Sequence, residues 1–243
     1  MANIIGIIPA RYGSTRFPGK PLIDIGGKSM IQRVYEQSLK SNSLKKVIVA
    51  TDDERIAEHV INFGGEVAIT LPTHQSGTDR CAEVLQKEKG EFDIVINIQG
   101  DEPFIDPAQI DLLAACFSDS EIDIATLVKK LIREEDIRNP NIVKAIMNKR
   151  NEAIYFSRSP IPYRRNPEAE ITYFKHIGIY GYRSNILKEI TQLPIGNFEK
   201  AESLEQLRWV ENCYRIGVKE TTMESLSIDT PDDLKHVEKY LKN

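Results

Sequence analysis

Hydrophobic positions in the first half of the chain follow two alternating patterns. Five short apolar runs rich in Val and Ile predict strands, at residues 3–9, 45–51, 66–70, 92–99 and 123–128. Three stretches between them have helical periodicity, at residues 29–41, 53–64 and 79–90, and the last two are predicted to end at glycines. Several runs are apolar at consecutive positions, which is typical of strands buried on both faces of a parallel sheet. The pattern therefore predicts a doubly wound α/β fold.

The second half of the chain has a different pattern. Residues 141–159 predict two extended runs joined by a polar turn, and residues 173–184 predict a further strand. Residues 197–213 predict one helix, and a final helix is expected after the loop at 228–231. The sequence contains no internal repeat or long linker, so we expect one domain over residues 1–243, with halves of about 1–130 and 131–243.

Polar loops at residues 11–20, 73–80 and 99–104 follow predicted strands. An open α/β sheet binds ligands beyond the carboxyl ends of its strands. The first loop, residues 11–20, carries Arg11, Arg16 and Lys20 together with two glycines. Glycines allow the backbone to approach phosphate oxygens closely, and the cations neutralise their charge. The loop is neither a Walker A sequence nor a G-x-G-x-x-G sequence. Polyphosphate binding is the favoured interpretation, and a solvated basic loop is the alternative.

Two carboxylates are candidate Mg²⁺ ligands. Asp101 is separated by one glycine from the apolar run at 92–99, and Asp229 precedes a predicted helix start. Mg²⁺ prefers one or two carboxylates together with phosphate oxygens and water. Each carboxylate also has a structural interpretation, Asp101 as a turn residue and Asp229 as part of a helix entry with Thr230 and Asp233 as a capping box.

Composition narrows the class of protein. The chain is 41% hydrophobic and 28% charged, which is the ordinary globular range. Its net charge of −4 argues against a bulk nucleic-acid surface, so any anion site must be local. No apolar run approaches the roughly 20 residues that span a bilayer, and the N-terminal residues do not read as a signal peptide. Three scattered cysteines are typical of a reducing compartment, so we expect a cytoplasmic protein that binds neither membrane nor nucleic acid.

Several motifs in order resemble the 3-deoxy-manno-octulosonate cytidylyltransferases. They are IIPARYGSTRFPGKPL, HQSGTDR, NIQGDEPF, YFSRSPIP, HIGIYGY, LEQLR and IDTPDDL, and together they extend over nearly the whole chain. The resemblance implies a three-layer α/β/α nucleotidyltransferase sandwich with a mostly parallel central sheet and a smaller sugar-binding and dimerisation layer. It also implies a homodimer that uses CTP and Mg²⁺ to activate 3-deoxy-D-manno-octulosonate (Kdo) for lipopolysaccharide synthesis. The first half is then the CTP-binding half, and the second binds the sugar.

The resemblance also implies roles for individual residues. Arg11, Lys20, Asp101 and Asp229 match catalytic residues, and the two aspartates match the metal ligands. The implied nucleotide-binding residues are Ala10, Arg11, Ser14, Arg16, Lys20, Ser76, Gly77, Arg80, Gln99 and Gly100. The implied sugar-binding residues are Gln99, Arg158, His176, Tyr180, Glu202, Glu205 and Gln206. Without the resemblance, His176 would be assigned to a strand surface or core, and the acids of 197–213 to a solvated helix face.

Alternatives remain at the level of substrate and class. An enzyme acting on 8-amino-Kdo would differ in only a few pocket side chains. A sialic acid cytidylyltransferase typically has a phosphate loop resembling ARGGSKGIPRKN, whereas this loop reads ARYGSTRFPGKPL. A non-catalytic nucleotide-sensing domain would be expected to lack Lys20, Asp101 or Asp229, and all three are present. The missing glycine fingerprint opposes an NAD-dependent oxidoreductase.

Overall fold

The chain folds into two compact units. The structure is a computed structural model, which describes residues 2–13, 17–224, 226–230 and 232–234. One unit consists of Met1–Asp111 and Glu224–Asn243, and the other of Leu112–Met223. The boundary thus lies before the division near residue 130 that the sequence predicts, and the C-terminal residues belong with the first unit. A single domain over the whole chain stays a prediction.

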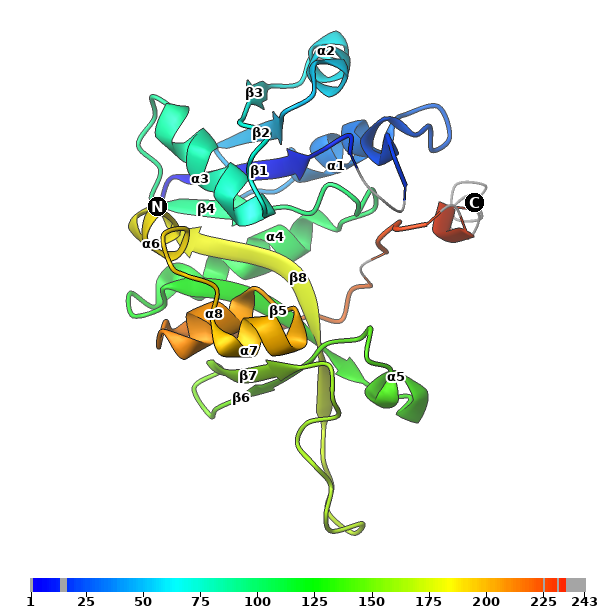
Figure 1. Cartoon of the computed structure of the whole chain (residues 1–243), viewed down its shortest axis with the longest axis vertical. Coiled ribbons are helices and arrows are strands. Elements are labelled where there is room, and N and C mark those ends of the chain that lie inside the picture. Colours follow the sequence, from blue (N-terminus) through cyan, green and yellow to red (C-terminus); the bar gives the residue numbers. More distant parts are fainter. Residues whose placement is uncertain (1, 14–16, 225, 231, 235–243) are drawn as a thin grey trace. The chain divides into compact units, whose positions relative to one another are not determined.

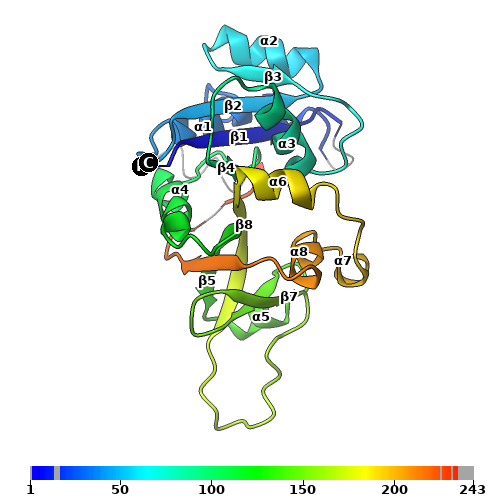
Figure 2. The same ribbon diagram turned by 90° about the vertical axis from the view of Figure 1, so that its left-hand side faces the viewer.

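A parallel sheet forms the centre of the first unit (Figure 1). Its strands are β1 (Ile4–Ala10), β2 (Lys46–Thr51), β3 (Val67–Ile69) and β4 (Ile94–Asn97), in the order β3-β2-β1-β4. Figure 2 shows the four strands following one another in this order. The strands coincide with four of the predicted apolar runs, and most of β1, β2 and β4 is buried, as expected for a sheet covered on both faces.

Helices α1 (Met30–Ser38), α2 (Glu54–Asn62) and α3 (Gly77–Lys87) connect these strands. The chain runs outward from β1 to β3 through α1 and α2, and returns to β4 through α3. Because such crossovers are right-handed, this reversal places α3 on the opposite face of the sheet from α1 and α2, which gives three layers. The predicted end of α3 at Gly90 is wrong, since the helix ends at Lys87 and Glu88 is already extended. The predicted glycine end of α2 is confirmed, with Gly64 at φ +83°.

The second unit contains five strands. They are β5 (Ile124–Leu131), β6 (Lys144–Met147), β7 (Ala153–Ser157), β8 (Tyr173–Arg183) and β9 (Ile216–Glu220). Strand β5 pairs antiparallel with β8 and parallel with β9, and the predicted hairpin of β6 and β7 is confirmed. The largest fully buried aromatic side chains in this unit are those of Trp209, Tyr182 and Phe156. With the parallel strands of the first unit, the α/β fold with a mostly parallel sheet is confirmed.

The single helix predicted over residues 197–213 is wrong. The structure has α7 (Asn197–Glu202) and α8 (Gln206–Glu211), separated at Ser203, whose φ of 53° is left-handed. The Glu211 carboxylate accepts hydrogen bonds from the backbone N–H groups of Asn197 and Phe198, and so caps the start of α7 from the end of α8. That capping requires the chain to reverse between the two helices.

Further elements were not predicted from the sequence. They are α4 (Pro107–Ala114), α5 (Glu134–Arg138), α6 (Ser184–Ile190), the short 3₁₀ helices η1 (Lys20–Leu22) and η2 (Ala115–Ser118), and β9. The predicted final helix is described only at residues 232–234, and the rest of it lies outside the described residues. No helix in the described part of the chain is long and apolar enough to cross a membrane.

Candidate functional site

A pocket of about 270 Å³ lies in the first unit, beyond the carboxyl ends of β1 and β4 and at the start of α3. Ten residues that the sequence analysis assigned to nucleotide, catalysis or metal line it: Ala10, Arg11, Lys20, Ser76, Gly77, Arg80, Gln99, Gly100, Asp101 and Asp229. They come from segments far apart in the sequence, so the fold brings together residues from four separate motifs. The two other predicted nucleotide residues, Ser14 and Arg16, lie outside the described residues.

Four lining residues were missed by the sequence analysis. Pro9 and Pro21 flank Arg11 and Lys20 in the chain, and His74 and Gln75 precede Ser76. All four belong to motifs that the sequence analysis quoted. The missing signal was therefore not the motif but the direction of each side chain, which a sequence does not give.

Lys20 is the centre of the charge arrangement in the pocket. Its Nζ lies 2.8 Å from Asp101 Oδ2 and 3.2 Å from Asp229 Oδ1. The lysine side chain is 14% exposed, against 27% for Asp101 and 40% for Asp229. One cation therefore contacts two carboxylates that are 128 positions apart in the chain.

The two carboxylates fit a Mg²⁺ site of the phosphate-assisted kind. Both carboxylates accept a hydrogen bond from the Lys20 ammonium group, and their oxygens are the hard donors that Mg²⁺ prefers. Among the described residues, no group of three or more His, Cys, Asp or Glu side chains could hold a metal. A metal held by Asp101 and Asp229 would therefore need further oxygens from a bound phosphate or from water, which is how Mg²⁺ is commonly bound.

The segment that carries Asp229 is held in place on both sides. Ile228 donates its backbone N–H to Asp101 O at 2.9 Å, and its side chain is fully buried with Ile25 and Met30. After it, Thr230 and Asp233 form the predicted capping box, with Thr230 N–H donating to Asp233 Oδ2 at 2.8 Å and Asp233 N–H donating to Thr230 Oγ1 at 3.3 Å. The helix-entry interpretation is thus confirmed, and it positions Asp229 beside Lys20 at the same time.

The start of α3 forms another wall of the pocket. Ser76 caps the helix in a capping box with Asp79, which fixes the first turn. The Arg80 guanidinium is almost completely buried and donates to Thr70 Oγ1 at 2.5 Å and Asp52 Oδ2 at 3.2 Å. Its charge is therefore partly compensated inside the protein, and the contacts hold the arginine against the sheet.

Two glycines are required by the backbone around the pocket. A Cβ at Gly100 would lie 2.7 Å from the backbone oxygen of Pro9, so only glycine allows the loop after β4 to approach the end of β1. Gly19 has φ +72°, and its N–H donates to Tyr12 O at 3.0 Å. The left-handed conformation of Gly19 directs the chain into η1, which begins at Lys20.

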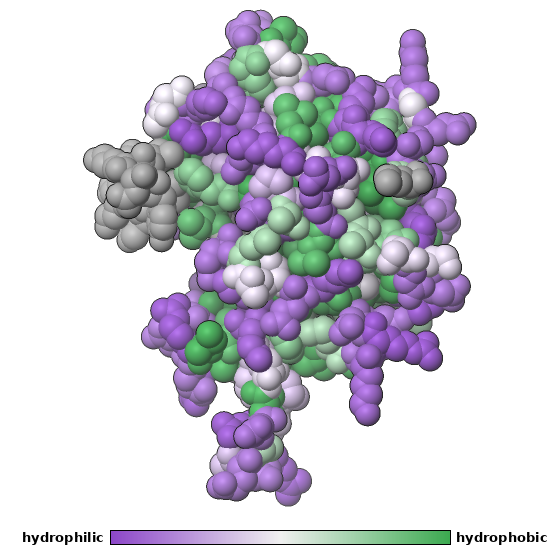
Figure 3. All heavy atoms as spheres, turned by 180° about the vertical axis from the view of Figure 1, so that it is seen from behind, coloured by the Kyte–Doolittle hydropathy of each residue, from purple (hydrophilic) through white to green (hydrophobic). Residues whose placement is uncertain are grey.

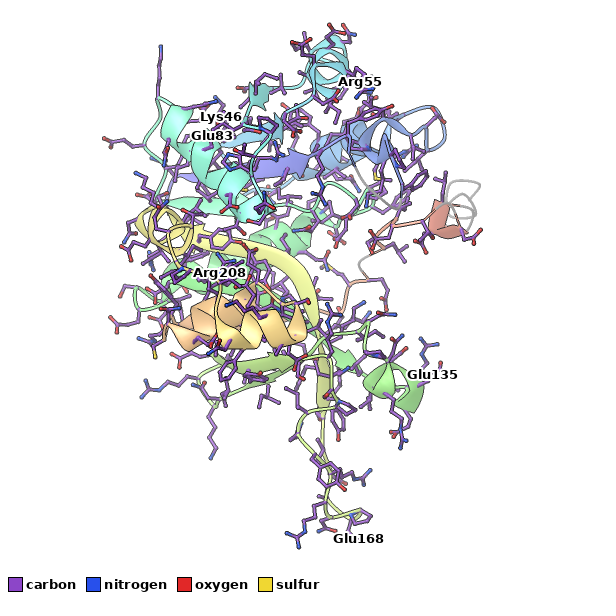
Figure 4. All side chains as sticks on the ribbon, in the orientation of Figure 1. Lys46, Arg55, Glu83, Glu135, Glu168 and Arg208 are labelled. Carbon is purple, nitrogen blue, oxygen red and sulfur yellow. The ribbon has the colours of Figure 1, made fainter. Side chains whose placement is uncertain are left out.

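His74 is oriented by a carboxylate outside the pocket. Its Nε2 forms a short hydrogen bond with Glu83 of α3 (Glu83 labelled in Figure 4). Burial raises the pKa of Glu83, but hydrogen bonds from Lys87, the Leu71 backbone N–H and His74 outweigh it and lower that pKa to about 2. The Glu83 carboxylate therefore stays charged at neutral pH and holds the His74 imidazole close to α3.

The predicted sugar residues lie in the second unit, and Arg158 and Glu202 contact each other directly. The Glu202 carboxylate accepts hydrogen bonds from Ser157 Oγ at 2.5 Å and from the Arg158 backbone N–H at 2.8 Å. The Arg158 guanidinium donates to the backbone oxygens of Glu202 at 2.7 Å and Pro140 at 3.1 Å. Both side chains therefore have structural partners, which a substrate would have to share or replace.

His176 and Tyr180 form a second cluster in this unit. Their ring centroids lie 5.3 Å apart, and Tyr180 stands edge-on to Trp209 at 5.0 Å. Burial, together with the charge of Lys175, lowers the pKa of His176 to about 3, so the imidazole is neutral. Burial also raises the pKa of Tyr180 well above its usual value, with Tyr182 and Glu205 adding to the effect.

The remaining predicted sugar residues begin α8. Glu205 is its N-cap residue, and Gln206 is its first residue and is buried. Trp209 of the same helix contacts Tyr180, so α8 packs next to the cluster of His176 and Tyr180. Gln99, which was also predicted to contact the sugar, lines the pocket of the first unit.

Comparison with known proteins gives consistent results. Residues 5–220 match the cytidylyltransferase family. The chain is 55% identical to a 3-deoxy-manno-octulosonate cytidylyltransferase of Bacteroides thetaiotaomicron, with 99% of each chain covered. It is 54% identical to the enzyme of the same name from Parabacteroides distasonis over the full length of both. A solved structure of CMP:2-keto-3-deoxy-manno-octonic acid synthetase complexed with CTP is 45% identical, with a TM-score of 0.95 and 99% of each chain covered.

Proposed function

Because the chain belongs to the cytidylyltransferase family, and within it to the 3-deoxy-manno-octulosonate cytidylyltransferases, we propose that it couples CTP and Kdo to give CMP-Kdo and pyrophosphate. The observation that carries the proposal is the pocket in which Lys20 contacts Asp101 and Asp229 beside Arg11 and the capped start of α3. The product would be the activated sugar used in lipopolysaccharide assembly.

The proposed reaction is a direct displacement at the α-phosphorus of CTP. The anomeric hydroxyl oxygen of Kdo forms the new bond to phosphorus, and its proton passes to water. The bond from the α-phosphorus to the oxygen that bridges it to the β-phosphorus breaks, and pyrophosphate leaves with that oxygen. Phosphoryl chemistry of this kind depends mainly on positioning and on stabilising charge. Lys20 and Arg11, which both line the pocket, are proposed to stabilise the leaving pyrophosphate, where negative charge develops. No nucleophilic side chain is required.

The start of α3 supports the nucleotide half of the proposal. Ser76 and Gly77 at the start of this helix line the pocket, and the positive end of a helix dipole favours a phosphate or the polar edge of a base. Ser76, Gly77 and Arg80 are proposed to lie near the cytosine and ribose. A site that hydrogen-bonds the amino edge of cytosine penalises uracil, because buried groups are then left unpaired.

We also propose that the enzyme uses Mg²⁺ held by Asp101 and Asp229. Two carboxylates and one lysine have a net negative charge. The ion would therefore supply the positive charge that is needed next to the phosphates. Asp101 and Asp229 would bind it, and Ile228, anchored on Asp101 and in the apolar cluster, would keep the second carboxylate in place. Chelation with EDTA should abolish turnover, and added Mg²⁺ should restore it.

The sugar half of the proposal rests on the second unit. Arg158, His176, Tyr180, Glu202, Glu205 and Gln206 are proposed to contact Kdo, whose carboxylate needs a cation and whose hydroxyls need donors and acceptors. Neutral His176 and buried Tyr180 suit uncharged hydroxyl groups, and Arg158 carries the positive charge. Gln99 would contact the sugar from the nucleotide pocket.

A cytoplasmic homodimer that binds neither nucleic acid nor membrane is proposed as well. The net charge of −4 and the local nature of the basic residues support the absence of nucleic acid. On the face drawn in Figure 3, hydrophobic side chains are scattered among hydrophilic ones, so the dimer is proposed from the family resemblance and not from that face. Sedimentation equilibrium would decide between a monomer and a dimer.

The test is pyrophosphate release from purified protein with CTP and Mg²⁺. Parallel reactions receive Kdo, 8-amino-Kdo or sialic acid, and UTP replaces CTP in a control. We expect pyrophosphate release only in the reaction that contains both CTP and Kdo. A strong preference for 8-amino-Kdo would change the sugar assignment only, whereas CTP binding without release with either sugar would favour a nucleotide-sensing domain and contradict the enzyme proposal.

A further inference from the structure

A β-bulge interrupts the pairing of β5 with β8 next to the His176 cluster. Leu127 lies opposite Ile177, but Thr126 lies opposite Tyr180, so Gly178 and Ile179 have no opposite residue in β5. Residues four apart in a regular strand are separated by about 13 Å, at about 3.3 Å per residue. The bulge shortens this path, and it explains how the rings of His176 and Tyr180 come within 5.3 Å of each other.

The hydroxyl of Thr126 fills this bulge. Its Oγ1 lies 3.0 Å from Ile177 O, 2.9 Å from Ile179 O and 3.0 Å from His176 Nε2. The threonine is fully buried, so these three atoms make up the hydroxyl's described surroundings. Threonine was not singled out by the sequence analysis, because nothing in an apolar strand distinguishes a structural hydroxyl from a functional one.

The three contacts determine where the hydrogens are. A carbonyl oxygen only accepts, and a hydroxyl has a single hydrogen to donate. The Thr126 hydrogen must therefore point to Ile177 O or Ile179 O, since otherwise two carbonyl oxygens would face the hydroxyl oxygen with no hydrogen between them. Of the two contacts that remain, the second carbonyl oxygen has no hydrogen to supply, so the contact with His176 is a hydrogen bond only when Nε2 carries the proton and donates to Thr126.

This assignment gives the other ring nitrogen a defined role. The imidazole is neutral, because burial lowers the pKa of His176 to about 3, so Nδ1 has a lone pair and accepts hydrogen bonds. The neighbouring Tyr180 is only 8% exposed, and its hydroxyl has no hydrogen-bond partner in the described part of the chain. The two ring centroids lie 5.3 Å apart, so the imidazole acceptor and the phenol hydroxyl suit a ligand hydroxyl, which can donate to one and accept from the other.

We propose that Thr126 is a positioning residue that holds His176 in the Nε2–H tautomer and thereby makes Nδ1 the acceptor for a hydroxyl of the sugar substrate. Thr126 itself touches no substrate. The inference rests on the proposed function for the identity of the substrate, but the tautomer is a property of the free protein and can be measured without turnover.

The first experiment is ¹⁵N NMR of the histidine rings in the full-length protein. The chain has four histidines, and a His176→Gln variant identifies the signals of His176 by their loss. Long-range ¹H–¹⁵N correlations should show a neutral ring protonated at Nε2 in the parent protein and in Thr126→Ser. An Nδ1–H ring in the parent protein would overturn the proposal, even if Thr126 variants failed to fold.

Steady-state kinetics then separate positioning from general stability. Thr126→Val keeps the branched shape and removes the hydroxyl, and Thr126→Ser keeps the hydroxyl. We expect Thr126→Val to raise the KM for Kdo about tenfold with the KM for CTP nearly unchanged, since one neutral hydrogen bond is worth about that factor. Thr126→Ser should restore the parent value, and Thr191→Val, which removes a hydroxyl bonded only to Lys188 O among its described contacts, should have no effect.

The outcomes also separate this inference from the proposed function. If the parent protein releases no pyrophosphate with Kdo, the proposed substrate is wrong, while the NMR result still decides the tautomer. A folded Thr126→Val protein with an unchanged tautomer, or with equal losses for CTP and Kdo, would show that the hydroxyl only stabilises the bulge and would overturn the positioning role.

Discussion

Replacing Lys20 by Met should uncover the repulsion between Asp101 and Asp229. The substitution keeps most of the length of the side chain and removes the ammonium group that lies 2.8 Å and 3.2 Å from the two carboxylates. At an effective dielectric constant of about 20, one such contact has a Coulomb energy of about 4 kcal/mol, but measured exposed pairs contribute about 0.2–1 kcal/mol. Lys20 is mostly buried and Asp229 is 40% exposed, so we place the combined loss at about 1–3 kcal/mol of unfolding free energy.

The loss should be visible in thermal unfolding and should be reversed by Mg²⁺. For a chain of this size, about 1 kcal/mol shifts Tm by about 2–4 °C. Lys20→Met should therefore unfold several degrees below the parent protein without metal. Because the two carboxylates then attract a divalent cation more strongly, saturating Mg²⁺ should raise the Tm of the variant more than that of the parent. The kcat/KM should nevertheless fall by about 10²–10³, as for other groups that stabilise developing charge.

Two further variants make the Lys20 experiment decisive. Lys28→Met removes a lysine that pairs with Glu36 at 2.5 Å, where both side chains are exposed, and it should change Tm little. Lys20→Arg keeps the charge and should keep most of the stability, although its geometry differs. If Lys20→Met were as stable as Lys28→Met, or if Mg²⁺ stabilised the parent protein more than Lys20→Met, the idea that Lys20 offsets two facing carboxylates would be refuted.

Two other substitutions test separate parts of the site. Asp101→Asn should abolish turnover at any Mg²⁺ concentration while far-UV circular dichroism stays unchanged, and substantial turnover at saturating Mg²⁺ would contradict the metal assignment. Glu83→Gln should remove a pH dependence of stability, because the pKa of Glu83 is lowered to about 2 from a usual value of 4.5. A carboxyl with a lowered pKa stabilises the fold above its usual pKa and loses that contribution as the pH falls towards the lowered value. Urea unfolding at about pH 5 and about pH 3 should therefore show a larger loss for the parent protein than for Glu83→Gln, and equal losses would argue against the Glu83 contacts.

Much of the first unit could be predicted because its strands are buried on both faces. Continuous apolar runs such as those of β1 and β4 have few alternative interpretations, and the order of strands and helices then fixes where the loops gather. This is why Lys20 and Asp101 could be assigned to one edge of the sheet from the residues, whereas Asp229 was assigned to the same site mainly by the family resemblance. Their separation in the sequence gave no direct indication of the shared ammonium group.

The second unit was harder to predict because long-range contacts override local patterns there. The break between α7 and α8 depends on Glu211 capping the start of α7, and the meeting of His176 and Tyr180 depends on the bulge opposite Thr126. Periodicity describes only neighbours along the chain, so it predicted one helix and a regular strand. The roles of Arg158 and Glu202 were implied by resemblance alone, and their contacts with backbone groups could not be read from spacing.

The first unit is discontinuous in the sequence, and this has a consequence for the timing of synthesis. Lys20 and Asp101 leave the ribosome long before Asp229, since all of Leu112–Met223 must be made in between. At about 5–20 residues per second, this interval lasts several seconds or more. A nascent chain can thus form the parallel sheet and the start of α3, but it lacks one of the two carboxylates next to Lys20. The segment that carries Asp229 is translated after the whole second unit and completes the charge arrangement, so a chain released before it would have Lys20 and Asp101 without the second carboxylate.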